Sequence, residues 1–187
     1  MHIEEAALHG VHGVVFPAIP KRNPYGAPLM RKYYSPDAKR CLSELLDVRK
    51  YEVIHVEGHY LLPLVPKAMW QSVILVEHNI ESDLYRQKAA LAESLRDKVK
   101  LTFQATMTQW SERKVWRNVA MTVAITDNDA TAMQRGAHGV PVVIVPNGAD
   151  HLTPADPQRD NRQSQQRPTL VFVGNFAYEP NLDAVRA

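Results

Sequence analysis

The chain has 187 residues, of which 45% are hydrophobic and 22% charged, and its formal net charge is +2. These values are close to those of an average globular protein, so they argue against general disorder and fit one domain, or one domain with part of another. The single cysteine, Cys41, excludes a disulfide framework and a thiolate metal site. A reducing cytoplasm is the compartment that we expect.

Short apolar runs alternate with helical patterns along the chain. Residues 14–16 form the first expected strand, and a proline-rich loop follows it. Residues 35–50 predict a helix, because Ser35 is a good N-cap and Pro36 suits the first helical position. Its expected buried stripe consists of Ala38, Cys41, Leu42, Leu45 and Leu46.

Two strands and two long helices are expected next. The strands cover residues 51–56 and 72–76, with a proline-containing loop or short helix between them. The helices cover residues 81–98 and 102–119. Their expected packing residues are Leu84, Leu91 and Leu95 in the first helix and some of Met107, Trp110, Val115 and Val119 in the second. Trp116 is also more typical of helix packing than of a sugar-stacking platform.

The remaining strands lie at residues 121–126 and 142–146. Between them, Thr126 and Asp129 form a capping box for a helix that ends near Gly136. The strands are continuous β-branched runs, which is typical of strands buried on both faces of a parallel sheet. The sequence therefore predicts an α/β fold with a Rossmann-like, doubly wound parallel sheet.

The composition changes after residue 150. Residues 151–168 are polar and proline-containing, which predicts a linker. Residues 169–187 then open with a buried strand, a glycine turn and the start of a helix. We therefore expect a first domain over residues 1–150 and the beginning of a second α/β domain after the linker.

Polar and turn-forming residues follow each strand of the first domain. In chain order the strand ends read "HVEGHY", "LVEHNIES", "AITDND" and "IVPNGAD". Parallel sheets bind ligands beyond the carboxyl ends of their strands, so these four segments predict the functional edge.

As an ordered set, these strand ends, with "WSERKVW" ahead of the third and "LVFVGNFAYEPN" after the fourth, resemble retaining glycosyltransferases of the GT-B fold, family 4, over roughly residues 50–183. The resemblance implies two Rossmann-like domains, with the acceptor side first and the nucleotide-sugar side second. It implies transfer of a sugar from a nucleoside-diphosphate sugar to an acceptor hydroxyl with retention. Neither a cofactor nor a metal ion is required if helix dipoles and side chains hold the departing diphosphate.

Three features depart from that family pattern. An opening strand with a glycine-rich loop is missing, Asn175 stands where the family often has a basic residue, and the family's late acidic pair would lie beyond residue 187. We therefore expect a chain that is incomplete at both ends and inactive on its own.

The resemblance assigns roles to particular residues. His78 is the expected catalytic residue, which would orient the acceptor hydroxyl or the transferred sugar. The expected acceptor-binding residues are Glu57, His59, Asn79, Glu81, Asn147 and Gly148. The expected donor-binding residues are Gly174 and Asn175.

Structural interpretations stand beside these roles. His78 could satisfy its own loop, Glu81 could compensate the positive end of a helix, and Asn147 with Gly148 could form a turn and hinge. Strand alternation would point His55, Glu57 and His59 the same way, and Glu77 and His78 lie on a nearby strand end. Together these residues invite a metal-site interpretation. His55 is instead expected to pack in the core, and the helical H-E-x-x-H pattern of zinc hydrolases is absent.

Two other function classes stay open. One is a sugar- or nucleotide-binding module without catalysis, and the other is a GT-B-type epimerase or a metal-dependent hydrolase. No nucleic-acid partner is expected. Residues 86–117 contain eight Lys/Arg against three Asp/Glu, so this basic face could meet an anionic membrane surface on the cytoplasmic side, or could be a solvated helical pair.

Overall fold

The computed structural model describes residues 2–4, 13–15, 27–48, 50–148, 181 and 185. The chain divides into two compact units, Met1–Gly148 and Ala149–Ala187. All elements described below belong to the first unit. The predicted linker and the strand and turn after it, with Gly174 and Asn175, lie outside the described residues.

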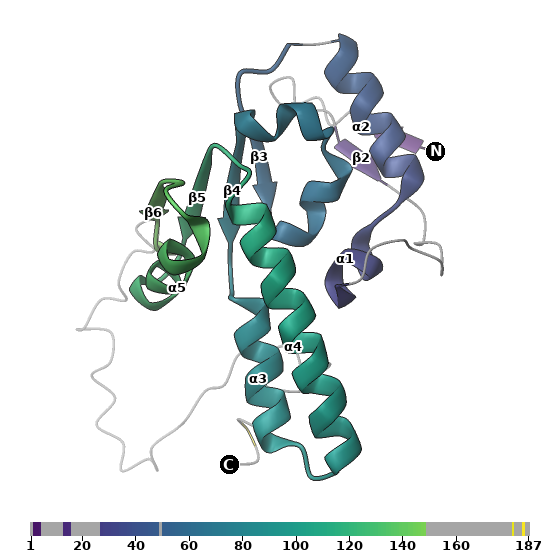
Figure 1. Cartoon of the computed structure of the whole chain (residues 1–187). Coiled ribbons are helices and arrows are strands. Elements are labelled where there is room, and N and C mark those ends of the chain that lie inside the picture. The colour runs from purple at the N-terminus through teal and green to yellow at the C-terminus, as the bar shows by residue number, and fades with distance from the viewer. Residues whose placement is uncertain are drawn as a thin grey trace, which may run out of the picture. The chain divides into compact units, whose positions relative to one another are not determined.

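A four-stranded parallel sheet is the centre of the first unit (Figure 1). Its strands are β3 (Ile54–Glu57), β4 (Val73–Glu77), β5 (Met121–Ala124) and β6 (Val142–Ile144), in the spatial order β3-β4-β5-β6. Helices alternate with these strands, so the predicted α/β fold with a parallel sheet is confirmed, and it is consistent with a Rossmann-like arrangement. Among the described strands the spatial order follows the chain order, so no reversal of strand order falls inside this sheet.

The register brings the carboxyl ends of the four strands to one edge. Glu57 pairs with Val76, Glu77 pairs with Ala124, and Ala124 pairs with Ile144. The residues that follow these strands therefore leave the sheet on the same side, as the sequence predicts.

The two outer strands correct the expectation that every strand is buried on both faces. The inner strands β4 and β5 are largely buried. In β3, His55 and Glu57 are exposed, and in β6 so are Val143 and Ile144. Because β3 and β6 form the edges of the described sheet, each has only one strand neighbour there, and their outward side chains reach solvent. A separate antiparallel pair, β1 (His2–Glu4) with β2 (Gly13–Val15), contains the strand expected near residue 14.

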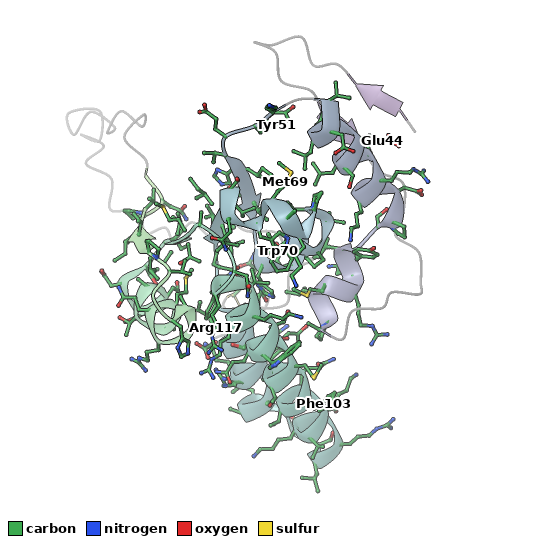
Figure 2. The ribbon with its side chains drawn as sticks, turned by 45° about the horizontal axis from the view of Figure 1, so that its top comes forward. Glu44, Tyr51, Met69, Trp70, Phe103 and Arg117 are labelled. Carbon is green, nitrogen blue, oxygen red and sulfur yellow. The ribbon has the colours of Figure 1, made fainter. Side chains whose placement is uncertain are left out.

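Short helices precede and interrupt the sheet. Helix α1 (Pro28–Tyr33) leads into α2 (Pro36–Val48), whose first turn is capped because the Ala38 amide donates to Ser35 Oγ at 3.3 Å. Two 3-10 helices, η1 (His59–Leu64) and η2 (Lys67–Ser72), connect β3 to β4. Trp70 of η2, labelled in Figure 2, donates its indole N–H to the Val65 carbonyl at 3.1 Å.

The long helical region after β4 breaks earlier than predicted. Helix α3 (Glu81–Leu91) and helix α4 (Leu95–Trp116) form an antiparallel hairpin that extends away from the sheet (Figure 1). The break is fixed by Ser94, whose hydroxyl accepts from the Asp97 amide at 3.0 Å. Ser94 is thus the N-cap of α4, a signal that apolar periodicity does not show.

The hairpin also corrects the expected packing faces. Leu91 and Leu95, predicted to be buried, are 83% and 77% exposed, because this part of the hairpin projects beyond the sheet. Trp110 is 62% exposed, whereas Val115, Trp116 and Val119 are buried. The packing prediction is therefore confirmed for these three residues and wrong for Trp110. No helix within the described residues is long and apolar enough to cross a membrane.

Helix α5 (Asp127–Ala137) joins β5 to β6 and follows the predicted capping pattern. The Asp129 amide donates to Thr126 Oγ1 at 3.1 Å. Gly136 packs against the Trp116 ring, which ties α5 to α4: a Cβ at this glycine would lie 2.8 Å from the ring. The main core lies between these helices, the 3-10 helices and the sheet, and includes Val56, Leu62, Val73, Leu75, Val115, Trp116, Val119 and Met133.

Candidate functional site

An exposed histidine–glutamate cluster lies at the carboxyl edge of β3 and β4. His55 and Glu57 are two residues apart on an edge strand, so they share its solvent face. His55 Nε2 lies 2.7 Å from Glu57 Oε1, and His78 Nε2 lies 2.6 Å from Glu57 Oε2. All three side chains are about half exposed. The parallel register therefore brings His78, which follows β4, onto the carboxylate of the neighbouring strand.

The carboxylate fixes how these two imidazoles can act. An ionised carboxylate only accepts hydrogen bonds, so Nε2 of each histidine is the donor. In the neutral ring, Nδ1 then carries the lone pair. The site therefore presents two oriented imidazoles at the ligand edge of the sheet, each able to accept a proton or a hydroxyl hydrogen bond through Nδ1.

His59 does not join that cluster, although strand alternation predicted that it would. Gly58 has a φ of +88°, a left-handed conformation that favours glycine, and it turns the chain as β3 ends. A Cβ at this glycine would lie 2.6 Å from the Tyr60 ring. The turn carries the His59 side chain into the interior, where it is fully buried. His55, Glu57 and His59 therefore cannot form one metal site, because His59 is buried away from the other two.

A second, buried polar cluster lies at the end of β4. Glu77 is almost completely buried and accepts hydrogen bonds from the Trp116 indole N–H at 2.9 Å and from the His59 amide at 3.3 Å. The His59 ring adds a contact between Nδ1 and Glu77 Oε1 at 3.2 Å. A carboxylate with several donors is stable in a protein interior, so Glu77 holds His59 and α4 in place.

Glu112 of α4 lies in the same interior region and is the most perturbed acid of the described chain. Burial raises the pKa of Glu112 to about 7, partly offset by the charge of His59 and by hydrogen bonding to Ser82. The Ser82 amide donates to Glu112 Oε1 at 3.1 Å, whereas Oε2 has no hydrogen-bond partner among the described residues. Near neutral pH this carboxyl therefore holds a proton for much of the time.

Opposing effects act on the His59 imidazole. Burial disfavours its charged form, but the charges of Glu77, Glu112 and Glu81, with the Glu77 hydrogen bond, outweigh burial and raise the pKa of His59. Tyr60 packs edge-on against His59, with ring centroids 5.5 Å apart, and stacks on Tyr33 at 4.8 Å. The buried cluster therefore contains two groups, His59 and Glu112, that bind their protons more tightly than usual.

The other predicted acceptor residues occupy different positions. Asn79 is exposed directly after His78. Glu81 is half-buried in the first turn of α3, where its charge suits the helix N-terminus, and burial raises its pKa. Asn147 and Gly148 are exposed beyond β6, two strands away from β4, and neither forms a hydrogen bond to the cluster within the described chain.

Sequence reasoning missed several residues that build the site. Within "HVEGHY" the sequence assigns Gly58 no role of its own, Trp116 is expected only to pack, and Glu112 lies in "WSERKVW" with no site role predicted for it. One signal for these residues is present in the sequence. Glu77 of "VEH" is the last residue of an apolar strand, and a buried acid there needs hydrogen-bond donors from other elements. Which helix supplies those donors depends on the tertiary fold.

Comparisons of this chain with protein-family models, with curated proteins and with solved structures yield no match. Among the described residues, no group of three or more His, Cys, Asp or Glu side chains is arranged to hold a metal ion.

Proposed function

We propose that this chain is the acceptor-side part of a retaining GT-B glycosyltransferase, similar to family 4. The enzyme would transfer a sugar from a nucleoside-diphosphate sugar to an acceptor hydroxyl. The observation that carries the proposal is Glu57, which bridges His55 and His78 at the carboxyl edge of the sheet. The motif order supports the family assignment, and the parallel sheet supports the fold that the family requires.

In this proposal His78 positions the acceptor. Its Nδ1 accepts the hydrogen bond of the sugar hydroxyl, while Glu57 holds the ring and stabilises a positive charge that develops on it. Asn79 is exposed beside it and offers an amide to neighbouring hydroxyls. His55, held by the other carboxylate oxygen, is an additional acceptor-contact residue.

Acceptor binding is the direct test, because it needs only this domain. Saturation-transfer NMR with a panel of free hexoses and nitrophenyl hexosides should detect binding of at least one sugar to the chain. His78→Asn should weaken that binding about tenfold, on the order of one well-formed hydrogen bond. His138→Asn is the matched control, because His138 is exposed at the end of α5, and it should leave binding unchanged.

Release of nucleoside diphosphate from nucleotide sugars separates the enzyme from a binding module. Turnover that His78→Asn lowers and His138→Asn spares would support the transferase. Sugar binding without any turnover, in this chain and in a longer one, would favour the non-catalytic module. Equal sugar binding by both variants would remove His78 from the site.

A further inference from the structure

A pocket on another part of the first unit has a composition of its own. Its volume is about 320 Å³, and α1, α2, the 3-10 region and α4 contribute to its walls. The lining is largely apolar and includes Met30, Val65, Trp70, Met107 and Trp110. This size and lining are typical of small-molecule sites. The pocket shares no lining residue with the Glu57 cluster.

Three lysines line the same pocket and no acidic residue does. Lys39 comes from α2, Lys67 from η2 and Lys114 from α4. None of the three forms an ion pair within the described part of the chain, whereas the exposed Arg40 and Arg86 both have aspartate partners. Lys114 instead lies over the Trp110 ring, 5.0 Å from its centroid. Three uncompensated ammonium groups around an apolar pocket produce a positive potential that an anion would relieve.

The buried polar group of the pocket is also suited to an anion. Ser111 is 4% exposed, and its hydroxyl lies 3.0 Å from the Met30 sulfur. A thioether is a weak acceptor, so this hydroxyl can turn to a ligand oxygen at little cost. The Trp70 indole N–H already donates to the Val65 carbonyl, so it is not a donor for a ligand in the pocket.

We propose that this pocket binds a small amphipathic anion, with an acyl or aromatic body and one carboxylate or phosphate group. The body would pack between Trp70, Trp110 and the methionines, and the anionic group would lie among Lys39, Lys67 and Lys114. The proposal is independent of the glycosyltransferase function, because the two sites use different residues.

Isothermal titration with three ligands of equal chain length tests the site. Decanoate and decyl phosphate, below their micelle concentrations, should bind, and neutral decanol should bind at least tenfold more weakly. The double variant Lys67→Gln/Lys114→Gln should weaken the anions about tenfold, since two partly exposed ion pairs are lost, and should leave decanol unchanged. Whichever anion binds more tightly identifies the head group as carboxylate or phosphate.

Two further variants keep the test decisive. Lys50→Gln/Arg135→Gln removes the same charge from exposed positions outside the pocket and the α3–α4 hairpin, and should have no effect on any of the ligands. Ser111→Leu fills the pocket and should abolish binding of all three, while the far-ultraviolet circular dichroism stays that of the parent. Equal affinity for decanol and the anions, or an equal loss in both charge variants, would overturn the proposal.

Discussion

At the residue scale, His55 and His59 lie on either side of Glu57 and Gly58 but differ completely in burial. His55 stays on the solvent face of β3, and His59 enters the core. The difference arises from one backbone conformation, because the φ of +88° at Gly58 rotates the chain as the strand ends. The same glycine therefore separates the exposed histidine–glutamate cluster from the buried polar one.

Gly58→Ala should destabilise the protein more than Gly139→Ala. Both glycines have a left-handed φ, +88° and +92°, so both substitutions carry a backbone cost of roughly 1 kcal/mol. Only Gly58 also faces a ring: its Cβ would meet Tyr60, which Tyr33 holds by stacking, whereas Gly139 faces open space. We expect an extra loss of about 1–3 kcal/mol at Gly58, measured by urea unfolding. Equal losses would show that Tyr60 moves freely.

The buried acid predicts how stability depends on pH. Glu112 has a pKa of about 7 in the folded protein against an ordinary value of 4.5, so folding favours its protonated form. This contribution is fully present below about pH 4.5 and is lost as the pH rises through 7. The raised pKa of His59 has the same sign, because the folded state also holds that proton more tightly above pH 6.5.

We therefore expect the free energy of unfolding to fall between pH 5 and 8. The loss attributable to Glu112 is on the order of 3 kcal/mol, because its pKa is about 7 in the folded protein against an ordinary 4.5. Glu112→Gln should flatten the profile, since glutamine carries no titrating proton. A Glu112→Gln profile that stays as steep as that of the parent would assign the pH dependence to other groups.

At the element scale, the α3–α4 hairpin exposes several large apolar side chains. Leu95, Val99 and Phe103 are spaced four residues apart on α4, so they share one face, and all three are exposed (Phe103 in Figure 2). Lys98 and Lys100 lie beside them and are exposed as well. Apolar groups next to basic ones are typical of surfaces that lie on anionic bilayers.

We propose that this hairpin contacts anionic membranes. The sequence predicted such a contact from the basic residues of 86–117 alone. The chain should sediment with vesicles that contain phosphatidylserine and not with phosphatidylcholine vesicles. Phe103→Ser should reduce sedimentation severalfold while changing stability by less than about 0.5 kcal/mol, because the side chain is exposed. Glu44→Ser is the control at an exposed helical position away from the hairpin (Figure 2). Binding to neutral vesicles, or no effect of Phe103→Ser, would contradict the proposal.

At the scale of the whole molecule, two candidate sites lie in one unit without sharing a residue. The Glu57 cluster uses the carboxyl edge of β3 and β4, and the lysine-lined pocket uses α2, η2 and α4. Mutations at sites that share no partners usually act independently.

Each ligand class should therefore respond only to its own variant. His78→Asn should weaken hexose binding and leave decanoate binding unchanged, and Lys67→Gln/Lys114→Gln should do the reverse. Titrations of both variants with both ligands check this. If either variant weakens both ligands, the two sites are coupled, or the variant alters the whole unit.

Although α1 and β1 are not predicted, local sequence patterns predict the strands and helices of the parallel sheet and the edge at which polar groups gather. These follow from local causes: β-branched runs, the caps at Ser35 and Thr126, and the common direction of parallel strands. The sequence also identified His78 and Glu57 as residues of that edge, which the register places in contact.

Which polar residues are buried, and what they contact, follows from tertiary packing and not from local patterns. Burial of His59 depends on the turn at Gly58, and the charge state of Glu112 depends on which elements pack around it. The exposure of Leu91, Leu95 and Trp110 could not be predicted from the sequence either. Periodicity shows that a helix has an apolar face but not whether anything packs on that face. The lysine-lined pocket draws on segments far apart in the chain, so no local pattern could have shown it.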